Sequence, residues 1–357
     1  MLIYIIHNLK INTSKKLVFF LGLNCAIIII KESDIMKKVE LHLHLDGSVR
    51  KSTVASLLNV KEEDIKNDLS VRDDNVDLKE YLTKFDLPIK VMQTKDNLKK
   101  IAYELGQDLE KDDVIYAEVR FAPMFHTKEG LNYDEIVSSV LDGFKMVNIK
   151  INLILCMMRG ASENDNLKTL DVAYRFLNRG VVALDLAGDE NKYKTKDYKN
   201  LFDIANKRNI PFTIHAGEAD GAKSVLDAVS FGAKRIGHGV RILEDEDALN
   251  EIKSKNITLE VCPTSNIQTK VVDKYEKHPI RKLYDKNVLL TISTDNNTVS
   301  NITLSKEYEK LKKYFDFTRE DFLKFNINAV NAAFISEKEK EEYINILKED
   351  YYEDIRN

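Results

Sequence analysis

Val39-Glu40-Leu41-His42-Leu43-His44-Leu45-Asp46-Gly47 alternates apolar and polar residues and ends in an Asp-Gly pair. This alternation predicts a β-strand, and Asp-Gly predicts a turn directly after it. In such a strand His42 and His44 point to the same side, about 7 Å apart, while the leucines occupy the opposite face. Imidazole is a good ligand for zinc, so the pair can form half of a metal site, although two histidines on a polar face would show the same pattern.

Counting this strand, eight short apolar runs are found along the chain, and most of them are followed by a helical pattern. The runs are 39–45, 114–123, 151–158, 181–188, 211–217, 235–239, 257–266 and 288–296. Strands that alternate with helices predict a parallel sheet, and eight of them predict closure into a (β/α)8 TIM barrel. A doubly wound open sheet is the alternative, but no Gly-x-Gly-x-x-Gly loop follows an early strand.

Two additions to the barrel are expected. Segment 78–92, within the long connection after the first strand, is more apolar than one helix face requires. Because this loop would lie over the mouth of the barrel, it predicts a hydrophobic lid, with an ordinary packed helical excursion as the alternative. Apolar residues at helical spacing over 98–109 predict a core-facing helix. The C-terminal stretch predicts extra helices, capped at Thr318 and by a capping box over 336–339.

Composition limits the class of protein. The 357 residues include 54 Lys and Arg against 58 Asp and Glu, a net charge of −4, which lacks the basic excess of a nucleic-acid-binding surface. The three cysteines are far apart, so a disulfide framework is unsupported and a reducing cytoplasm is the expected location.

Residues 1–35 differ from the rest of the chain. The apolar run 17–30 is too short for a comfortable membrane span, and no Ala-x-Ala-like cleavage site follows it. We interpret this leader as sequence upstream of a natural start at Met36, with a signal or anchor segment as the alternative. Residues 36–357 are then predicted to form a single catalytic domain, with no stable membrane association.

Polar residues gather where the predicted strands end. In a TIM barrel the active site lies at these ends, and a catalytic zinc needs a few nitrogen or oxygen ligands and one open position for water. The expected ligands are His42, His44, His215 and Asp295. His238 and Glu218 remain to hold the water and to handle protons on the substrate, since this chemistry needs an acid and a base besides the metal.

The combined motifs resemble the adenosine deaminase family of the amidohydrolase superfamily, from about Lys37 to the C-terminus. The matching stretches are 42–48, 116–123, 185–190, 215–218, 237–239, 261–266 and 293–295. The resemblance implies hydrolytic deamination of adenosine and deoxyadenosine to inosine and deoxyinosine, with one zinc ion bound by the four ligands given above. It also implies a place in purine salvage and a small purine nucleoside as partner.

The resemblance implies a role for each remaining site residue. Protonated Glu218 would donate to purine N1, His238 would position the water and help to deprotonate it, and His44 would also lie beside the substrate. The Gly188 backbone would meet N3, and Asp46 would accept from a ribose hydroxyl.

The chain departs from the family pattern at Asn296, where many members carry a second aspartate. There the amide can donate to purine N7 without titrating.

Three alternatives stay open on the sequence. A relative that acts on adenine or on methylthioadenosine would share these motifs, although Asp46 favours a substrate with a free ribose hydroxyl. Adenosine monophosphate is disfavoured because Asp46 would repel its phosphate. A catalytically silent purine-binding relative is the third, although the acid, base and metal set is present.

Overall fold

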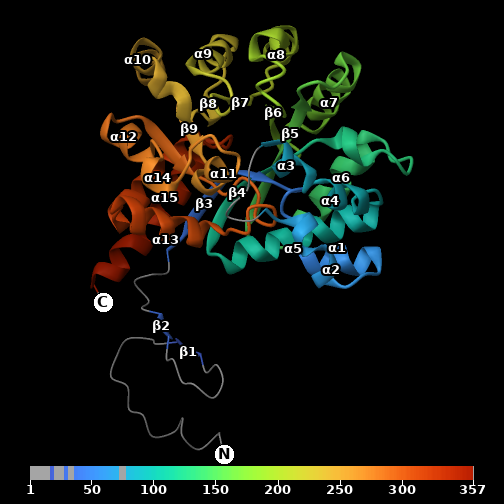
Figure 1. Cartoon of the computed structure of the whole chain (residues 1–357), viewed down its shortest axis with the longest axis horizontal. Coiled ribbons are helices and arrows are strands. Elements are labelled where there is room, and N and C mark those ends of the chain that lie inside the picture. Colours follow the sequence, from blue (N-terminus) through green and yellow to red (C-terminus); the bar gives the residue numbers. More distant parts are fainter. Residues whose placement is uncertain (1–16, 20–27, 31–35, 72–77, 357) are drawn as a thin grey trace, which may run out of the picture.

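Eight parallel strands surrounded by helices form the body of the molecule in the computed structural model, which describes residues 17–19, 28–30, 36–71 and 78–356 (Figure 1). The strands are β3 (Lys38–His44), β4 (Val114–Phe121), β5 (Lys150–Met158), β6 (Val181–Ala187), β7 (Thr213–Ala216), β8 (Arg235–His238), β9 (Thr258–Val261) and β10 (Leu289–Ile292). Six of them lie within predicted runs, and β3 and β5 begin one residue before theirs.

Parallel pairing closes these strands into a barrel. Strands β3, β4, β5 and β6 pair in this order, and so do β7, β8, β9 and β10. The bridges Leu43 to Asp295 and Leu184 to Phe212 join the two halves at both seams. The (β/α)8 barrel predicted from the alternating runs is therefore confirmed.

The seventh predicted run extends too far. Its strand, β9, ends at Val261, and α11 begins at Pro263. Proline has no backbone N–H to donate to a neighbouring strand, and its fixed φ suits the first position of a helix. The prediction of a strand up to residue 266 was therefore wrong.

Helices cover the outside of the barrel, and three of them follow the last strand. They are α1 (Lys51–Leu58), α2 (Glu62–Leu69), α3 (Leu78–Thr83), α4 (Asp86–Val91), α5 (Lys95–Lys111), α6 (Tyr133–Phe144), α7 (Glu163–Phe176), α8 (Lys199–Lys207), α9 (Ala222–Phe231), α10 (Glu246–Ser254), α12 (Ile280–Asp285), α13 (Leu304–Phe315), α14 (Arg319–Ala332) and α15 (Glu337–Arg356). The predicted apolar stripe of α5 is buried, and the caps at Thr318 and Ser336 are present.

Successive side chains of β3 point alternately to the apolar core and to the interior of the barrel. Leu41, Leu43 and Leu45 are fully buried in the main apolar cluster, as their face of β3 predicts. Glu40 and His42, on the other face, are equally buried. An isolated buried charge is costly, so charged side chains in the barrel interior must form ion pairs or hydrogen bonds. The ion pairs found there support the site described below.

The insertion after β3 lies at the barrel mouth. Tyr81 and Leu82 of α3, and Phe85 and Ile89 beside and within α4, line the same cavity as the strand ends, and Figure 1 shows α3 over the strands. The expected position of the hydrophobic lid is thus confirmed for 78–92.

The leader is described only at β1 (Leu17–Phe19) and β2 (Ile28–Ile30), which pair antiparallel. The other residues of the leader lie outside the described residues, so its interpretation as sequence upstream of Met36 stays a prediction. Within the described parts of the chain, none of the helices combines the length and hydropathy of a membrane span.

Candidate active site

A cavity of about 690 Å³ opens at the carboxyl ends of the strands. The predicted site residues that line it are His44, Asp46, Gly188, His215, Glu218, His238, Asp295 and Asn296. His42 lies fully buried in contact with them. The structure therefore brings together every residue that was assigned to the site.

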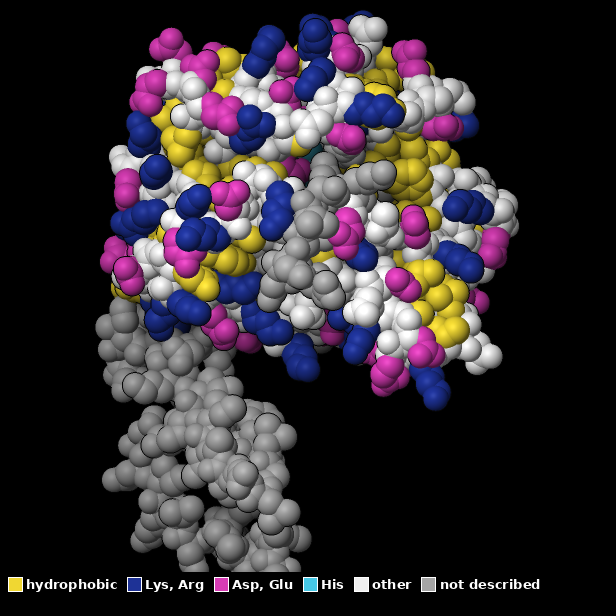
Figure 2. All heavy atoms as spheres, viewed as in Figure 1, with side chains coloured by type: hydrophobic (Ala, Val, Ile, Leu, Met, Phe, Trp, Pro, Cys, Tyr) yellow, Lys and Arg dark blue, Asp and Glu magenta, His cyan; other side chains and the backbone are white. Residues whose placement is uncertain are grey.

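On the face of the molecule that Figure 2 shows, Lys and Arg side chains are interspersed with Asp and Glu.

Imidazoles and a carboxylate converge at the base of this cavity. His44 Nε2 lies 3.2 Å from His215 Nε2 and 3.4 Å from Asp295 Oδ1, and His42 Nε2 lies 3.5 Å from the same oxygen. Possible ligand atoms of His42, His215, His238 and Asp295 all lie within 4.8 Å of one another. Ligands about 2.0–2.1 Å from a tetrahedral zinc ion would lie about 3.3 Å apart. The separations of 3.2, 3.4 and 3.5 Å among His42, His44, His215 and Asp295 therefore fit a metal.

The first and last barrel strands fix the spacing between the histidine pair and the carboxylate. The backbone N–H of His44 donates to the Asp295 carbonyl (2.7 Å), and the N–H of Asp295 donates to the His42 carbonyl (2.9 Å). Two site residues, His238 (φ 62°) and Asp295 (φ 64°), have left-handed backbone conformations. Such conformations are unfavourable for residues with a Cβ and persist only where the surroundings enforce them.

Two carboxylates orient the buried histidines. His42 Nδ1 lies 2.8 Å from Glu260 Oε2, and His215 Nδ1 lies 2.8 Å from Asp185 Oδ2. With Nδ1 held by a carboxylate, Nε2 is the atom left to bind a cation, as is usual for metal-binding histidines. His42 Nε2 is buried without a hydrogen-bond partner among the described residues. This donor set therefore fits a metal ion.

Arg120 links the two supporting carboxylates. It is fully buried, and its guanidinium lies 3.0 Å from Asp185 and 2.9 Å from Glu260 while donating to the Leu41 carbonyl (2.6 Å). Arg235 forms a further ion pair with Glu260 (2.5 Å). Burial alone would raise the pKa of both carboxylates, but the arginines and histidines outweigh it and hold each pKa well below its usual value.

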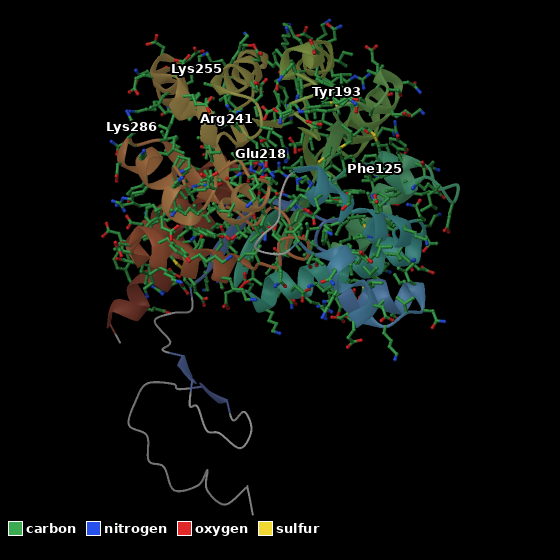
Figure 3. The ribbon with its side chains drawn as sticks, viewed as in Figure 1. Phe125, Tyr193, Glu218, Arg241, Lys255 and Lys286 are labelled. Carbon is green, nitrogen blue, oxygen red and sulfur yellow. The ribbon has the colours of Figure 1, made fainter. Side chains whose placement is uncertain are left out.

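Glu218 has a different environment. Burial, followed by the nearby charges of Asp295 and Glu190, raises the pKa of Glu218 to about 8. Its Oε2 lies 3.6 Å from His238 Nε2, and its Oε1 accepts a hydrogen bond from Thr269 Oγ1 (3.4 Å). Figure 3 places Glu218 near the middle of the molecule. A carboxyl that keeps its proton at neutral pH beside a metal cluster can act as a general acid.

A chain of hydrogen bonds determines the tautomer of His238. The backbone N–H of Ile280 donates to His278 Nδ1 (3.2 Å), so the proton of neutral His278 is on Nε2, which donates to Asn266 Oδ1 (3.1 Å). The Asn266 amide then donates to His238 Nδ1 (3.1 Å). Neutral His238 therefore carries its proton on Nε2, the nitrogen nearer Glu218. His278 therefore has a structural role, because it holds Asn266 in place for His238.

Asp46 and Gly188 lie on the cavity wall. Asp46 is buried, its Oδ1 has no hydrogen-bond partner within the described chain, and burial raises the pKa of this carboxyl to about 7. A buried oxygen without a partner is costly unless a ligand supplies one. Gly188 has φ 103°, and a Cβ there would lie 3.3 Å from Arg159 Cβ, so glycine suits this close approach.

Asn296 joins the site to the lid. Its amide donates to the Tyr81 hydroxyl (2.8 Å), which is 2.8 Å from Ser300 Oγ. A Cβ on Gly47 would lie 1.7 Å from Asn296 Oδ1, so the glycine leaves room for this side chain. One of the two amide hydrogens of Asn296, which the sequence analysis expected to bind the substrate, thus binds Tyr81 of α3 instead.

The sequence predictions missed the roles of Arg120, Asp185, Glu190, Glu260 and Tyr81. A signal existed for three of them, because charged residues inside otherwise apolar strands must face a polar interior. His126, which follows β4 near the strand ends, is buried against Phe121, with Nδ1 3.0 Å from the Met92 carbonyl.

The closed barrel and the cluster of polar groups at its strand ends define the class: a hydrolase of the amidohydrolase type with a candidate metal centre. The family model described as adenosine deaminase matches residues 37–350. An adenosine deaminase of Clostridium perfringens is 42% identical over 321 residues, which cover 86% of this chain and 96% of the relative. One of Clostridium botulinum is 42% identical over 327 residues, covering 88% and 98%. The chain belongs to the adenosine deaminase family.

Solved structures agree on the fold. An adenine deaminase from Arthrobacter aurescens has a TM-score of 0.80 at 21% identity, covering 88% of this chain and 98% of its own. An N6-methyl-AMP deaminase from Arabidopsis has a TM-score of 0.81 at 25% identity with the same coverage. A zinc-bound amidohydrolase from Burkholderia ambifaria has a TM-score of 0.82 at 21% identity, covering 90% and 92%.

Proposed function

We propose that this chain hydrolyses adenosine and deoxyadenosine at C6 of the purine, releasing ammonia and leaving inosine and deoxyinosine, with one zinc ion per chain. The observation that carries this proposal is the position of Glu218, a carboxyl with a raised pKa beside the imidazole cluster. Attack at C6 is difficult while the purine ring keeps its aromaticity, and protonation of N1 removes that obstacle.

The metal would be held by His42, His44, His215 and Asp295. Three of these, His42, His215 and Asp295, belong to the group whose ligand atoms lie within 4.8 Å of one another, and His44 Nε2 lies 3.2 Å from His215 Nε2 and 3.4 Å from Asp295 Oδ1. A zinc ion bound there supplies Lewis acidity, which lowers the pKa of water toward neutrality. The Glu260 and Asp185 carboxylates lie at Nδ1 of His42 and His215, which would leave Nε2 of each free to bind such an ion.

The chain's own groups account for the proton transfers. Glu218 gives its proton to purine N1 as the water oxygen bonds to C6, and the carboxylate then carries a proton of the water to the departing amino group. The C6–N bond breaks, ammonia leaves, and the second proton of the water passes to Glu218, which leaves a carbonyl at C6 and restores the acid. His238 presents Nε2–H, which orients the water oxygen and stabilises the charge that develops on it. That His238 also helps to remove a proton stays a prediction.

The cavity wall supplies recognition of the nucleoside. The backbone N–H of Gly188 would donate to N3, and the partnerless oxygen of Asp46 would accept from a ribose hydroxyl. Asn296 would meet N7 with its remaining amide hydrogen. The substrate would lie under α3 and α4, whose apolar side chains keep water from the reacting atoms. This single catalytic domain would span residues 36–357.

The direct test is the ultraviolet change that accompanies loss of the amino group. We expect the purified protein to convert adenosine and deoxyadenosine but not adenine or adenosine monophosphate. A chelator should abolish the conversion, and added zinc should restore it. The matched control is Glu218→Gln, which keeps the size of the side chain but removes the acid and should reduce kcat by about 100-fold or more.

Each other outcome points to a different conclusion. Turnover of adenine alone would contradict the assignment of Asp46 and favour an adenine deaminase. Turnover of a nucleotide in preference to adenosine would favour an activity like that of the N6-methyl-AMP relative. Full activity in Glu218→Gln would exclude Glu218 as the acid.

A further inference from the structure

The loop that carries Glu218 is built around a second carboxylate, that of Glu190. This residue follows β6 and is only 2% exposed. Loop 217–220 connects β7 to the start of α9, and four successive backbone N–H groups of the loop donate to Glu190. They are Gly217 to Oε1 (2.7 Å) and Glu218, Ala219 and Asp220 to Oε2 (3.0, 2.8 and 2.9 Å). Consecutive amides around one anion form a stable concavity.

Further contacts fix the same loop from both sides. Ser224, in the first turn of α9, donates from Oγ to Glu190 Oε1 (2.5 Å). Arg241 donates its backbone N–H to the Gly217 carbonyl (3.0 Å) and its guanidinium to the Ala219 carbonyl (2.6 Å). Hydrogen bonds to an ionised carboxylate are roughly twice as strong as neutral ones. Glu190 is therefore the main anchor of the loop.

The side chain of Glu218 is held much less firmly than its backbone. Its carboxyl has one long hydrogen bond, from Thr269 (3.4 Å), and lies 3.6 Å from His238. Its own backbone N–H and those of both neighbours are bound to Glu190. Glu190 therefore fixes the backbone position from which the Glu218 side chain extends into the cavity.

We propose that Glu190 is a positioning residue that places the Glu218 carboxyl at hydrogen-bonding distance from purine N1. This inference rests on the role proposed above for Glu218. Glu190 acts through the loop, and its negative charge also contributes, after burial and Asp295, to the raised pKa of Glu218.

Glu190→Gln tests the proposal because it removes the charge and replaces one acceptor oxygen by an NH₂ group that faces N–H donors. We expect kcat for adenosine to fall by about 100-fold, the loss typical of a 1 Å misplacement. KM should change little, since the ribose and metal contacts stay in place. The control is Glu251→Gln, which removes an exposed carboxylate of α10 paired with Lys255 and should keep the kcat of the unsubstituted protein.

Two nucleosides separate positioning from general damage to the cavity. Purine riboside keeps N1 but has no amino group to lose, so an adduct of water at C6 would stay bound and resemble the transition state, whose binding follows kcat and not KM. 1-Deazaadenosine keeps the amino group and lacks N1. In Glu190→Gln the affinity for purine riboside should weaken by a factor similar to the loss in kcat, and the affinity for 1-deazaadenosine should stay unchanged. Equal weakening of both would overturn the proposal, as would an unchanged kcat.

A second variant covers the case in which Glu190→Gln does not fold, as judged by circular dichroism. Ser224→Ala deletes one hydroxyl and should give a smaller loss with the same ligand pattern; equal loss for both ligands would again overturn the proposal. The unsubstituted protein, assayed in parallel, separates the two levels of inference. If it deaminates adenosine while the variants match it, only the role of Glu190 fails; if it deaminates no nucleoside, the proposed function fails and this inference with it.

Discussion

Replacing Arg120 by methionine should destabilise the protein far more than the loss of an ordinary ion pair. The variant keeps the length of the side chain but removes contacts to Asp185 (3.0 Å), Glu260 (2.9 Å) and the Leu41 carbonyl (2.6 Å). Glu260 still has Arg235 at 2.5 Å, but Asp185 loses its arginine, and burial lowers the pKa of its imidazole partner His215, 2.8 Å away. Removing one partner of a buried pair costs about 3–5 kcal/mol, because a charge stays buried without compensation.

The melting temperature gives the measurement. An entropy of unfolding of about 2.1 cal/mol/K per residue means that a domain of about 320 residues loses about 1.5 °C per kcal/mol, so Arg120→Met should melt about 4–7 °C lower. The control is Arg175→Met, which breaks the exposed pair with Asp134 (2.5 Å; both side chains nearly half exposed) and should cost no more than about 1 kcal/mol. Equal melting temperatures for the two variants would refute the view that Arg120 compensates the buried carboxylates.

The pH dependence of the same variant has a defined sign. In the folded protein the pKa of Asp185 is depressed: burial raises it, but His215 and Arg120 outweigh burial. A depressed carboxyl stabilises the fold above its unfolded pKa, and this contribution is lost as the pH falls through the folded pKa. Without Arg120 the folded pKa moves up, so Arg120→Met should unfold at a less acidic pH. Urea unfolding across the acid range measures this, and identical acid midpoints would refute it.

Three further predictions concern catalysis. Asp46→Ala should raise KM for adenosine about 10- to 100-fold, which corresponds to the loss of a hydrogen bond to a charged group, and should leave any turnover of adenine unchanged. Steady-state kinetics on both substrates measure this, and an equal loss on both would contradict the assignment of Asp46 to the ribose. Tyr81→Phe removes the hydroxyl that binds Asn296 and Ser300 and should raise KM about 2- to 10-fold, with Tyr174→Phe at the surface as control; an unchanged KM would contradict the coupling of lid and site. Because Glu218 acts in its protonated form and its pKa is raised to about 8, kcat/KM should fall as the pH rises through about 8, and a rate that rises there would exclude this role.

The sequence predicted those features that depend on local pattern. Alternation placed His42 and His44 on one face of β3, and the position of His215 and Asp295 at the ends of apolar runs placed them at one rim. This reasoning works because parallel strands in a barrel end at the same edge. It failed after Val261, where an apolar run continued into a helix that begins at Pro263.

The supporting groups could not be found in the same way. Glu190 binds a loop 27 to 30 residues further along the chain, and Tyr81 meets Asn296 across 215 residues. Such contacts depend on how loops turn, which hydrophobic periodicity does not encode. Arg120 could be expected to face the interior, yet its two partners come from β6 and β9, and only the closed barrel brings them together.

The left-handed backbone at His238 and Asp295 means that this fold gives up stability at its own centre. A glycine at either position would adopt the same φ without steric cost and would remove this local strain. The same change would delete an imidazole or a carboxylate from the candidate metal site. Selection for heat resistance alone would therefore act against the active site, and a screen for thermostable variants should be run together with an assay for turnover.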